Sequence, residues 1–420
     1  MSSNRNPDPA LSASNRRPVL GLFLNMPMHE TEGRLSARYP HLFDFFLALG
    51  GRTSATWLCV PLRRSAEPRA EYGPVELPEQ VHLAGLPHWS SAPMVVRRFH
   101  RIAPAAVVMV ARNIGRWDVV GAVVPSVVGT IFVTVARLRG RPVFLLVRGE
   151  KQRTVSWIMG RRLRTLPYIW ALQAMEARVR AWIDAGVPTF VAGHELVQRY
   201  RTPNARIYNL YPGVSRDFPA AAAPRAIDDS QRRPLRLITV ARLSREKGTD
   251  DLLRAAAILR RGGAQVTLTV VGDGPERGRL TGLASELGLD GEVEFAGFLR
   301  QGHELVAALD RADVFVLASH SEGLPHSVVE AMARALPVVA TDVGGIPELL
   351  GDDAGVVVPS ADPAALASAL AKLADDPARR ARLSACSLER AQRFDPERVL
   401  EEFCARLADA YPALAGLQSQ

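Results

Sequence analysis

Cysteine and lysine are scarce in this chain of 420 residues. The three cysteines, Cys59, Cys386 and Cys404, are scattered, odd in number and without the spacing of metal ligands. They are therefore predicted to be small buried hydrophobic residues in a reducing compartment. The 52 basic residues include only three lysines, so arginine carries most of the positive charge.

Features of nucleic-acid-binding and secreted proteins are missing as well. The sequence has no recognised nucleic-acid motif, no aromatic ladder and no block of consecutive Lys and Arg residues, so a nucleic-acid partner is not expected. Met1–Arg17 is polar and has no apolar core, which predicts a disordered tail and no signal peptide. The expected location is the cytoplasm.

One stretch without charge approaches the length of a transmembrane helix. Val119–Ala136 has 18 residues, the lower limit for a membrane span. Pro125 divides it into a β-branched run and a helix-like run. This division favours a strand at Val119–Val124 followed by a helix at Val127–Leu138, and a membrane span is the alternative.

Charge is distributed unevenly along the chain. Residues 1–217 hold 29 Lys and Arg against 14 Asp and Glu, whereas residues 218–420 hold 23 against 29. In the basic half, arginines mix with apolar residues at Val95–Arg101 and Trp157–Arg164. Such stretches either lie against an anionic membrane surface, here the inner face of the plasma membrane, or are solvated helix faces. Both interpretations stay open.

Buried β-branched runs alternate with helical segments along most of the chain, which predicts an α/β protein. We expect two Rossmann-like, doubly wound parallel-sheet domains that face an interdomain cleft, where a ligand would bind. The expected division is a tail at 1–17, an N-terminal domain at 18–217, a linker at 218–234, a C-terminal domain at 235–392, and a helix at 393–420 that packs back toward the N-terminal domain. A long polar loop, Asn25–Leu35, is expected after the first strand.

The segment Ala312–Leu350 carries two carboxylates that a packed crossover between strands does not need. It is predicted to form a strand (Val314–Leu317), a Gly/Pro loop (Ser319–His326), a helix (Ser327–Ala335) and a second strand (Pro337–Thr341). Glu322 lies in the loop, and Glu330 lies eight residues later in the helix. Their placement therefore indicates a chemical role for the two carboxylates rather than a role in packing the crossover.

Three further loops follow strands of the same predicted sheet. Arg242 and Lys247, after the first strand, are suited to bracket a diphosphate. Gly272 and Gly274, after the second strand, would let the backbone approach an anionic ligand, although a plain tight turn explains them equally well. Backbone groups after the third strand are placed to bind a nucleobase edge, at Gly297, Phe298 and Leu299. Because the carboxyl ends of parallel strands share one edge, all these loops should converge on one crevice.

In combination these motifs resemble the nucleotide-sugar-binding domain of retaining glycosyltransferases of family 4, which have the GT-B fold. The resemblance covers residues 235–350 and rests on Ala241-Arg242-Leu243 with Lys247-Gly248, Val271-Gly272-Asp273-Gly274-Pro275, Ser321-Glu322-Gly323 through Glu330-Ala331-Met332-Ala333, and Pro337-Val338-Val339-Ala340-Thr341 with Gly344-Gly345. The sequence holds no Asp-x-Asp pair that would indicate a metal, so neither a metal nor a cofactor is expected.

The resemblance implies a function for each of these residues. Arg242 and Lys247 would hold the donor diphosphate, Glu330 would bind the ribose hydroxyls, and Glu322 would face the donor sugar. The loop before the helix would cradle the sugar and phosphate, through Gly323, Leu324, Pro325 and His326. The structural alternatives are that Glu322 caps the following helix and that Glu330 is a surface carboxylate.

The N-terminal domain departs from the family pattern. Members usually carry a Gly-Gly pair after the first strand, where this chain has Gly33 as the predicted donor contact. Many members also have a sugar-directed His where this chain has Arg148-Gly149-Glu150; His29 is a candidate replacement, and an exposed bystander is the more common outcome for a loop histidine. Tyr211-Pro212-Gly213-Val214 resembles the family turn before the linker. Ala335 replaces a common Gly, which should only tighten that helix end.

The resemblance implies a retaining, metal-independent glycosyltransferase that moves a sugar from a nucleotide diphosphate sugar to a hydroxyl of a sugar or lipid-linked acceptor. Cell-envelope polysaccharide or glycolipid synthesis is the expected setting. In this family the leaving phosphate can take the acceptor proton, so no general base is required from the protein. The alternatives are a non-catalytic nucleotide-sugar-binding regulator and a GT-B nucleotide-sugar 2-epimerase, although such epimerases lack the Ser-Glu-Gly to Glu-Ala-Met pattern.

Overall fold

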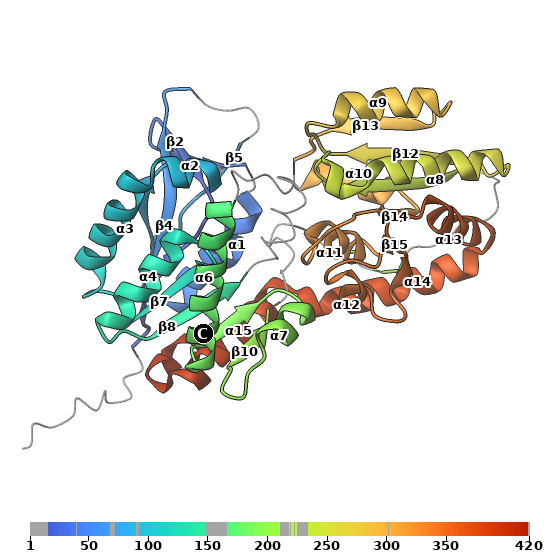
Figure 1. Ribbon diagram of the computed structural model, residues 1–420. Helices are drawn as coiled ribbons and strands as arrows, with labels where there is room; N and C mark the ends of the chain where they lie inside the picture. The colour runs from blue at the N-terminus through green and yellow to red at the C-terminus, as the bar shows by residue number, and fades with distance from the viewer. Residues whose placement is uncertain are drawn as a thin grey trace, which may run out of the picture.

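A computed structural model shows two α/β domains, each built on its own sheet (Figure 1). It describes residues 16–418 except 39, 68–71, 90–91, 148–165, 211–217, 219, 222, 225–233 and 301. Several predicted features lie outside these residues, namely most of the tail and linker, Trp157–Arg164, Arg148-Gly149-Glu150 and Tyr211-Pro212-Gly213-Val214. The domain boundaries therefore stay predictions.

The N-terminal domain is organised around a ten-stranded sheet within the described residues, in the order β10-β9-β8-β7-β1-β4-β2-β3-β5, with β6 also paired to β4. Its strands are β1 (Val19–Phe23), β2 (Met28–Thr31), β3 (Arg34–Ala37), β4 (Ala55–Arg64), β5 (Gly73–Pro74), β6 (Val81–Pro87), β7 (Val119–Val124), β8 (Val143–Val147), β9 (Thr189–Val191) and β10 (Ile207–Asn209). All its pairings are parallel except those of β3 with β2 and β5. A parallel sheet must be covered on both faces.

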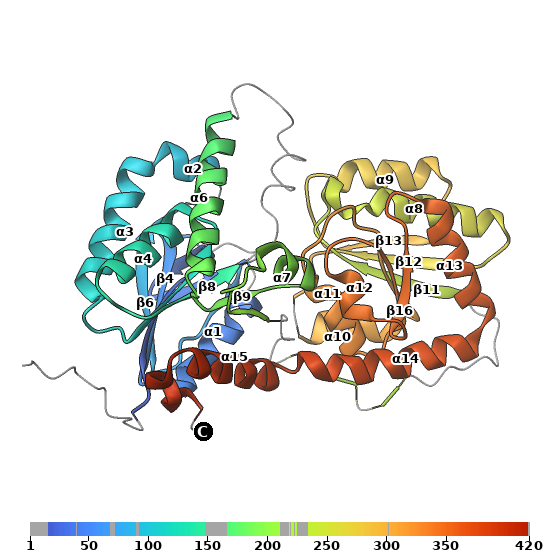
Figure 2. The same ribbon diagram turned by 60° about the horizontal axis from the view of Figure 1, so that its bottom comes forward.

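Helices supply that cover. They are α1 (Asp44–Leu49), α2 (Ala92–Arg97), α3 (Phe99–Asn113), α4 (Val127–Leu138), α6 (Leu166–Asp184) and α7 (His194–Tyr200). Buried side chains of α3, α4 and α6 share one core cluster with one face of the sheet. The other face packs on α1 and on a helix from the C-terminal end of the chain, α15 (Pro396–Ala410). Figure 2 shows α15 lying beneath the N-terminal sheet, next to the end of α14.

The C-terminal domain has a six-stranded parallel sheet in the order β13-β12-β11-β14-β15-β16. Its strands are β11 (Leu235–Val240), β12 (Val266–Val271), β13 (Val293–Gly297), β14 (Val314–Leu317), β15 (Val338–Thr341) and β16 (Gly355–Val358). Its helices are α8 (Thr249–Arg261), α9 (Arg277–Glu286), α10 (His303–Arg311), α11 (His326–Ala333), α12 (Ile346–Leu350), α13 (Pro363–Asp375) and α14 (Pro377–Ala391). The predicted α/β architecture with two Rossmann-like sheets is confirmed.

Two sequence expectations about apolar segments can be compared with the structure. Val119–Ala136 forms β7 and most of α4, as predicted, and no helix among the described residues has the length and apolarity needed to cross a membrane. Cys59 and Cys404 are buried, and burial raises the pKa of the Cys59 thiol and raises that of Cys404 to about 11. Cys386 is only half-buried, so the prediction of burial is wrong for that thiol.

Two expectations about loops are corrected. The segment predicted as a polar loop folds into the β2–β3 hairpin, because Glu32 and Gly33 both adopt positive φ and form its tight turn. Ala335, which follows α11, has φ +56°. The replacement of glycine therefore places a Cβ in the left-handed region, which costs about 1 kcal/mol, and does more than tighten the helix end.

Candidate active site

The loops that follow β11 to β15 lie along one edge of the C-terminal sheet, because these parallel strands are neighbours in the order β13-β12-β11-β14-β15. They bring the predicted donor-binding residues of this domain together. Not all of them lie in loops: Glu330 lies inside α11, His326 is the first residue of that helix and not part of the predicted loop, and Gly297 is the last residue of β13. The geometry thus assembles the predicted set at the edge where α/β proteins bind ligands.

Lys247 and Glu322 form an ion pair across two of these loops. Lys247 Nζ lies 2.6 Å from Glu322 Oε1, which also accepts a hydrogen bond of 2.7 Å from Ser319 Oγ. The Glu322 side chain is 8% exposed, so removal of the cation would leave a nearly buried carboxylate. Pro325, not Glu322, is the N-cap of α11. The capping alternative for Glu322 is therefore wrong.

A glycine pair after β15 holds the backbone of the Glu322 loop. Gly344 has φ +57°, and a Cβ at this position would lie 2.3 Å from the Glu322 carbonyl oxygen. The Gly345 amide donates a hydrogen bond of 2.8 Å to the Gly323 carbonyl. A Cβ on Gly345 would also meet the Leu324 side chain at 2.3 Å. Two successive strand-end loops therefore pack directly on each other, which fixes Glu322 in place.

Glu330 lies on the buried side of α11 and is 6% exposed. Its helix neighbours Val329 and Ala331 belong to the core. A surface carboxylate was the structural alternative, and the structure excludes it. A carboxylate is kept inside a protein only where donors of the protein or of a ligand satisfy it. Its burial at the ligand edge fits the ribose-binding function that the resemblance implies, which stays a prediction.

Arg242 differs from Lys247 in its surroundings. Its side chain is exposed, and no residue in the described part of the chain makes a hydrogen bond or an ion pair with its guanidinium. A free guanidinium beside an edge with helix N-termini is available to an anion from solution.

The glycines after β12 are explained by packing between loops. A Cβ on Gly272, whose φ is +129°, would lie 1.9 Å from the Ala241 carbonyl oxygen. A Cβ on Gly274 would lie 2.2 Å from the Leu243 carbonyl oxygen, and the Leu243 amide donates a hydrogen bond of 3.1 Å to Asp273 O. Close packing on the backbone of the loop after β11 accounts for both glycines, and a direct ligand contact at either stays a prediction.

The loop after β13 continues this arrangement. Gly297 has φ +71°, and its carbonyl accepts a hydrogen bond of 2.7 Å from the Gly272 amide. Phe298 is 51% exposed, whereas Leu299 packs against the core. An exposed aromatic ring can stack on a planar base.

The loop after β11 and the start of α8 both contact the loop that carries Glu322. The His320 amide donates a hydrogen bond of 2.8 Å to the Glu246 carbonyl, and His320 Nε2 lies 3.4 Å from Asp251 Oδ2. Burial raises the pKa of Asp251, and the charge of His320 opposes that shift.

At the start of α9, a hydrogen bond from Arg279 lowers the pKa of Glu276.

The two domains meet through Glu348 of α12. Its carboxylate accepts hydrogen bonds from the His194 amide (2.5 Å) and from Asn209 Nδ2 (2.6 Å). A Cβ on Gly193 would lie 3.7 Å from Leu324. These N-terminal residues follow β9 or end β10, so the carboxyl edges of both sheets face each other. No motif in the sequence indicated Glu348, which lies in α12 beyond the predicted strand Pro337–Thr341.

A cluster of rings lies at the same edge of the N-terminal sheet, farther along from that contact. His29 is 4% exposed, and its ring centroid lies 4.5 Å from that of Tyr72 and 5.6 Å from that of His88. Beside them Trp89 Nε1 donates a hydrogen bond of 2.9 Å to Asn25 Oδ1. The expectation that His29 is an exposed bystander is wrong. His88 and Trp89 directly follow β6, and that strand-end position was the signal that could have revealed them.

Gly33 has a local explanation. It is exposed at the β2–β3 turn with φ +76°, and its Cβ position faces open space. The turn requires this conformation, and a donor contact for Gly33 stays a prediction.

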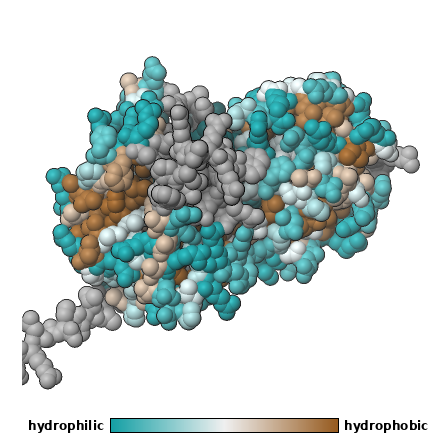
Figure 3. Space-filling model, in the orientation of Figure 1, coloured by the Kyte–Doolittle hydropathy of each residue, from teal (hydrophilic) through white to brown (hydrophobic). Residues whose placement is uncertain are grey.

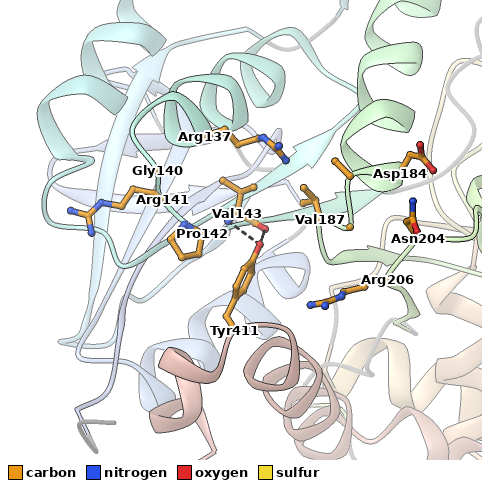
Figure 4. Close-up of a pocket in the computed structure, with 12 residues that line it drawn as sticks. Arg137, Gly140, Arg141, Pro142, Val143, Asp184, Val187, Asn204, Arg206 and Tyr411 are labelled. Carbon is orange, nitrogen blue, oxygen red and sulfur yellow. Dashed lines mark hydrogen bonds between the residues drawn. The ribbon is translucent and has the colours of Figure 1, made fainter. Parts of the chain in front are cut away.

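A cavity of about 880 Å³ lies at the opposite, amino end of the N-terminal sheet (Figure 4). Tyr411 crosses it and donates a hydrogen bond of 2.8 Å to the Val143 carbonyl, while Arg206 points toward its ring and Arg141 points away. Burial raises the pKa of Tyr411, and the Val143 hydrogen bond and nearby arginines oppose the shift. This cavity lies away from the strand-end loops and is not part of the candidate site.

Comparison with known protein families identifies the domain that carries the site. Residues 225–389 match the family model "Glycosyl transferases group 1". The C-terminal domain belongs to the glycosyl transferases group 1 family. The motifs on which the resemblance at residues 235–350 rests all lie inside this match, whereas Gly33 and Tyr211-Pro212-Gly213-Val214 lie outside it.

Curated relatives carry names consistent with that family. The chain is 41% identical over 145 residues to the putative colanic acid biosynthesis glycosyltransferase WcaL of Escherichia coli strain K12, covering 33% of this chain and 36% of the relative. It is 35% identical over 243 residues to the D-inositol 3-phosphate glycosyltransferase of Saccharomonospora viridis, covering 55% of this chain and 56% of the relative. The chain thus spans about a third to a half of the curated relatives it matches.

Solved structures extend the likeness to both domains. Sucrose-phosphate synthase from Thermosynechococcus elongatus superimposes with a TM-score of 0.73 at 20% identity, covering 94% of this chain and 100% of that one. Anabaena Alr3699/HepE in complex with UDP superimposes with a TM-score of 0.66 at 18% identity, covering 93% and 100%. Both domains of the described structure therefore share the GT-B fold of these solved structures.

Proposed function

We propose that this protein is a glycosyltransferase that transfers a sugar from a nucleotide diphosphate sugar to a hydroxyl acceptor, with retention of configuration at the anomeric carbon. The observation that carries the proposal is the ion pair of Lys247 with nearly buried Glu322, set beside buried Glu330 on the strand-end loops of a group 1 domain. A structural neighbour with the same fold is in complex with UDP-glucose, which supports a nucleotide-sugar donor.

In the proposed reaction, negative charge develops on the nucleoside diphosphate as the glycosidic bond breaks. Arg242 and Lys247 supply fixed positive charge at that position, together with the N-terminal turn of α11. Arrival of the diphosphate gives Lys247 a second anionic partner besides Glu322. Glu322 then accepts a hydrogen bond from the donor sugar, and Glu330 accepts hydrogen bonds from the ribose hydroxyls.

The acceptor side of the proposed site is the ring cluster of His29, Tyr72 and His88. Rings with a few polar atoms suit a sugar acceptor, whose ring packs on an aromatic face while its hydroxyls make hydrogen bonds. The cluster lies on the sheet edge that faces the C-terminal domain. The relatives WcaL and AmsK carry names from colanic acid and amylovoran biosynthesis, which supports a setting in polysaccharide synthesis.

A non-catalytic nucleotide-sugar-binding regulator is the second candidate. The absence of the family Gly-Gly pair after the first strand favours it, because Gly33 serves a hairpin turn instead. The 2-epimerase alternative lacks a supporting contact in the described site.

The test is calorimetric titration of the protein with a panel of nucleotide sugars, followed by an assay for released nucleoside diphosphate. A glycosyltransferase binds at least one donor and releases its nucleoside diphosphate, at a rate that a suitable sugar acceptor raises. Binding without release under any acceptor supports the regulator, and no binding of any nucleotide sugar contradicts both. Release measured with and without EDTA tests metal independence, and the anomeric configuration of the product tests retention.

A further inference from the structure

The cavity of Figure 4 lies where four segments of the chain meet at the amino end of the N-terminal sheet. They are the end of α4 with the start of β8, the end of α6, the residues that lead into β10, and Tyr411, which directly follows α15. The volume of about 880 Å³ falls within the range of about 300–1,000 Å³ that small-molecule pockets occupy. A molecule larger than a simple inorganic ion would therefore fit.

Two arginines place positive charge near the Tyr411 hydroxyl. Burial raises the pKa of Tyr411, whereas the charges of Arg137 and Arg206 both act to lower it, so both guanidinium groups lie within electrostatic reach of the phenol. Arg206 Nη1 also donates a hydrogen bond of 3.3 Å to the Ala410 carbonyl, and its side chain points toward the tyrosine ring (Figure 4). Neither arginine pairs with a carboxylate of the described residues. Two uncompensated guanidinium groups suit the oxygens of a phosphate.

The other polar side chains of the cavity can bind hydroxyl groups. Asp184 is the one acidic residue among the described lining residues, and Asn204 supplies an amide. Neither side chain forms a hydrogen bond or an ion pair with another described residue, so both are available to a ligand. Tyr411 contributes an aromatic ring, on which a sugar ring can pack. This combination favours a phosphorylated sugar over a bare anion.

The surface around the cavity is polar. Figure 3 shows mostly hydrophilic residues on the lower part of the N-terminal domain, where Figure 1 draws α15 and the C-terminus. An apolar partner would find little hydrophobic surface to bury there, so a small hydrophilic ligand is favoured.

Arg141 lines the same cavity but does not face it. Its Nη2 donates a hydrogen bond of 3.1 Å to the Gly115 carbonyl, and Figure 4 shows the side chain pointing away from Tyr411. The cavity thus has two arginines that are placed to hold a phosphate and a third that is not. This difference supplies a matched control for the test.

We propose that this cavity is a binding site for a sugar phosphate, separate from the candidate active site. The phosphate lies between Arg137 and Arg206, and the sugar hydroxyls make hydrogen bonds with Asp184 and Asn204. The Tyr411 hydroxyl keeps its hydrogen bond to the Val143 carbonyl, while its ring packs on the sugar. Because the cavity lies at the end of the sheet opposite the strand-end loops, its ligand is neither the donor nor the acceptor of the proposed transfer. The proposal therefore does not depend on that function.

A bound ligand should fasten the C-terminal segment to the N-terminal domain. Tyr411 follows α15, which continues from α14 of the other domain through Gln392–Phe394. A ligand held by Arg137, Arg206 and Tyr411 would link three segments that are far apart in sequence. Since such a ligand binds only the folded chain, it should raise the Tm.

The experiment is calorimetric titration of the full-length protein with glucose 1-phosphate, glucose 6-phosphate and ribose 5-phosphate, beside glucose and inorganic phosphate. At least one sugar phosphate should bind at one site per chain, more tightly than inorganic phosphate, and raise the Tm, while glucose should not bind. Each of Arg137→Gln and Arg206→Gln should weaken this binding about tenfold, because a charged hydrogen bond is lost. Arg141→Gln should leave it unchanged, and Asp184→Ala should weaken binding of the sugar phosphate but not of inorganic phosphate.

Lys247→Ala separates this cavity from the candidate donor site, because that variant should bind the sugar phosphate as the wild type does. Thermal denaturation without ligand checks that each variant is folded. Titration of Arg206→Gln with UDP and other nucleoside diphosphates reports on the donor site alone, so failure of this proposal and failure of the proposed function are distinguishable. The proposal is overturned if no sugar phosphate binds or if inorganic phosphate binds as tightly, which would indicate an adventitious ion only. Equal losses in Arg141→Gln and Arg206→Gln, or a loss in Lys247→Ala, would also overturn it.

Discussion

Glycines serve different purposes in the two domains. In the C-terminal domain they lie after strands, where Gly272 and Gly344 bring one loop backbone against another. In the N-terminal domain two glycines lie inside strands: a Cβ on Gly21 would meet the Trp117 ring at 2.3 Å, and one on Gly121 would meet Phe144 at 2.2 Å. The first arrangement builds a site from backbone, whereas the second makes room for aromatic side chains in a core. A glycine that follows a strand end therefore indicates a site built from loops, whereas a glycine inside a strand makes room for core packing.

The two domains also differ in how their positively charged side chains are paired with carboxylates. In the C-terminal domain, one of the two candidate site cations, Lys247, pairs with Glu322. In the N-terminal domain, Arg137 and Arg206 beside Tyr411 pair with no described carboxylate. A cation with a buried partner is held in one geometry, whereas unpaired surface cations are free to adjust to an anionic ligand.

The largest effect is expected from Gly272→Ala. Its Cβ would collide with the Ala241 backbone at φ +129°, so the free energy of unfolding should fall by about 3 kcal/mol. Urea denaturation measures this change. Gly278→Ala is the control: Gly278 lies in α9 with open space at its Cβ position, and alanine there should stabilise by about 0.5–1 kcal/mol. Equal stability of the wild type and Gly272→Ala would contradict the packing of loop on loop.

A smaller loss is expected from Gly121→Ala in the N-terminal sheet. The collision is with the Phe144 ring, which can move, so the loss should be about 2 kcal/mol. The second substitution Phe144→Leu should recover part of it, because it removes the colliding atoms. Affinity for nucleoside diphosphate, measured by calorimetry, should stay unchanged. If that affinity falls with stability, the distinction between the two kinds of glycine is wrong.

Lys247→Ala should lower donor turnover at least about tenfold, equivalent to about 1.4 kcal/mol of transition-state stabilisation. The physical reason is twofold: the diphosphate loses a cation, and Glu322 is left without its partner. Lys372→Ala, at an exposed position of α13, is the matched control and should behave like the wild type. Near-normal turnover in Lys247→Ala would remove this residue from the site.

Tyr411→Phe should have the smallest effect. It keeps the ring and removes the hydrogen bond to the Val143 carbonyl, so the free energy of unfolding should fall by about 1 kcal/mol. Thermal denaturation measures the change, and donor turnover should not move. A loss of turnover in a stable Tyr411→Phe protein would connect the cavity of Figure 4 to the site.

The fold and the convergence of the C-terminal strand-end loops were predictable because short motifs coincide with strand ends, whereas donor binding by these loops stays a prediction. The bounds of β7, α4 and β14 agree with the sequence pattern, since each is a clean β-branched run or a helix with a cap. The N-terminal hairpin was missed because Glu32 is a non-glycine residue at positive φ. The His29 cluster was missed because its rings come from segments far apart in sequence, and packing alone brings them together.

The most direct test of the central claim is the affinity of the Glu330→Ala variant for the nucleoside diphosphate of the donor, measured by calorimetric titration beside the wild type. Because Glu330 is buried at the edge that holds Lys247 and Arg242, the account predicts that the variant stays folded and binds at least about tenfold more weakly. Equal affinity in a folded Glu330→Ala protein would contradict the claim that these strand-end loops form the donor site.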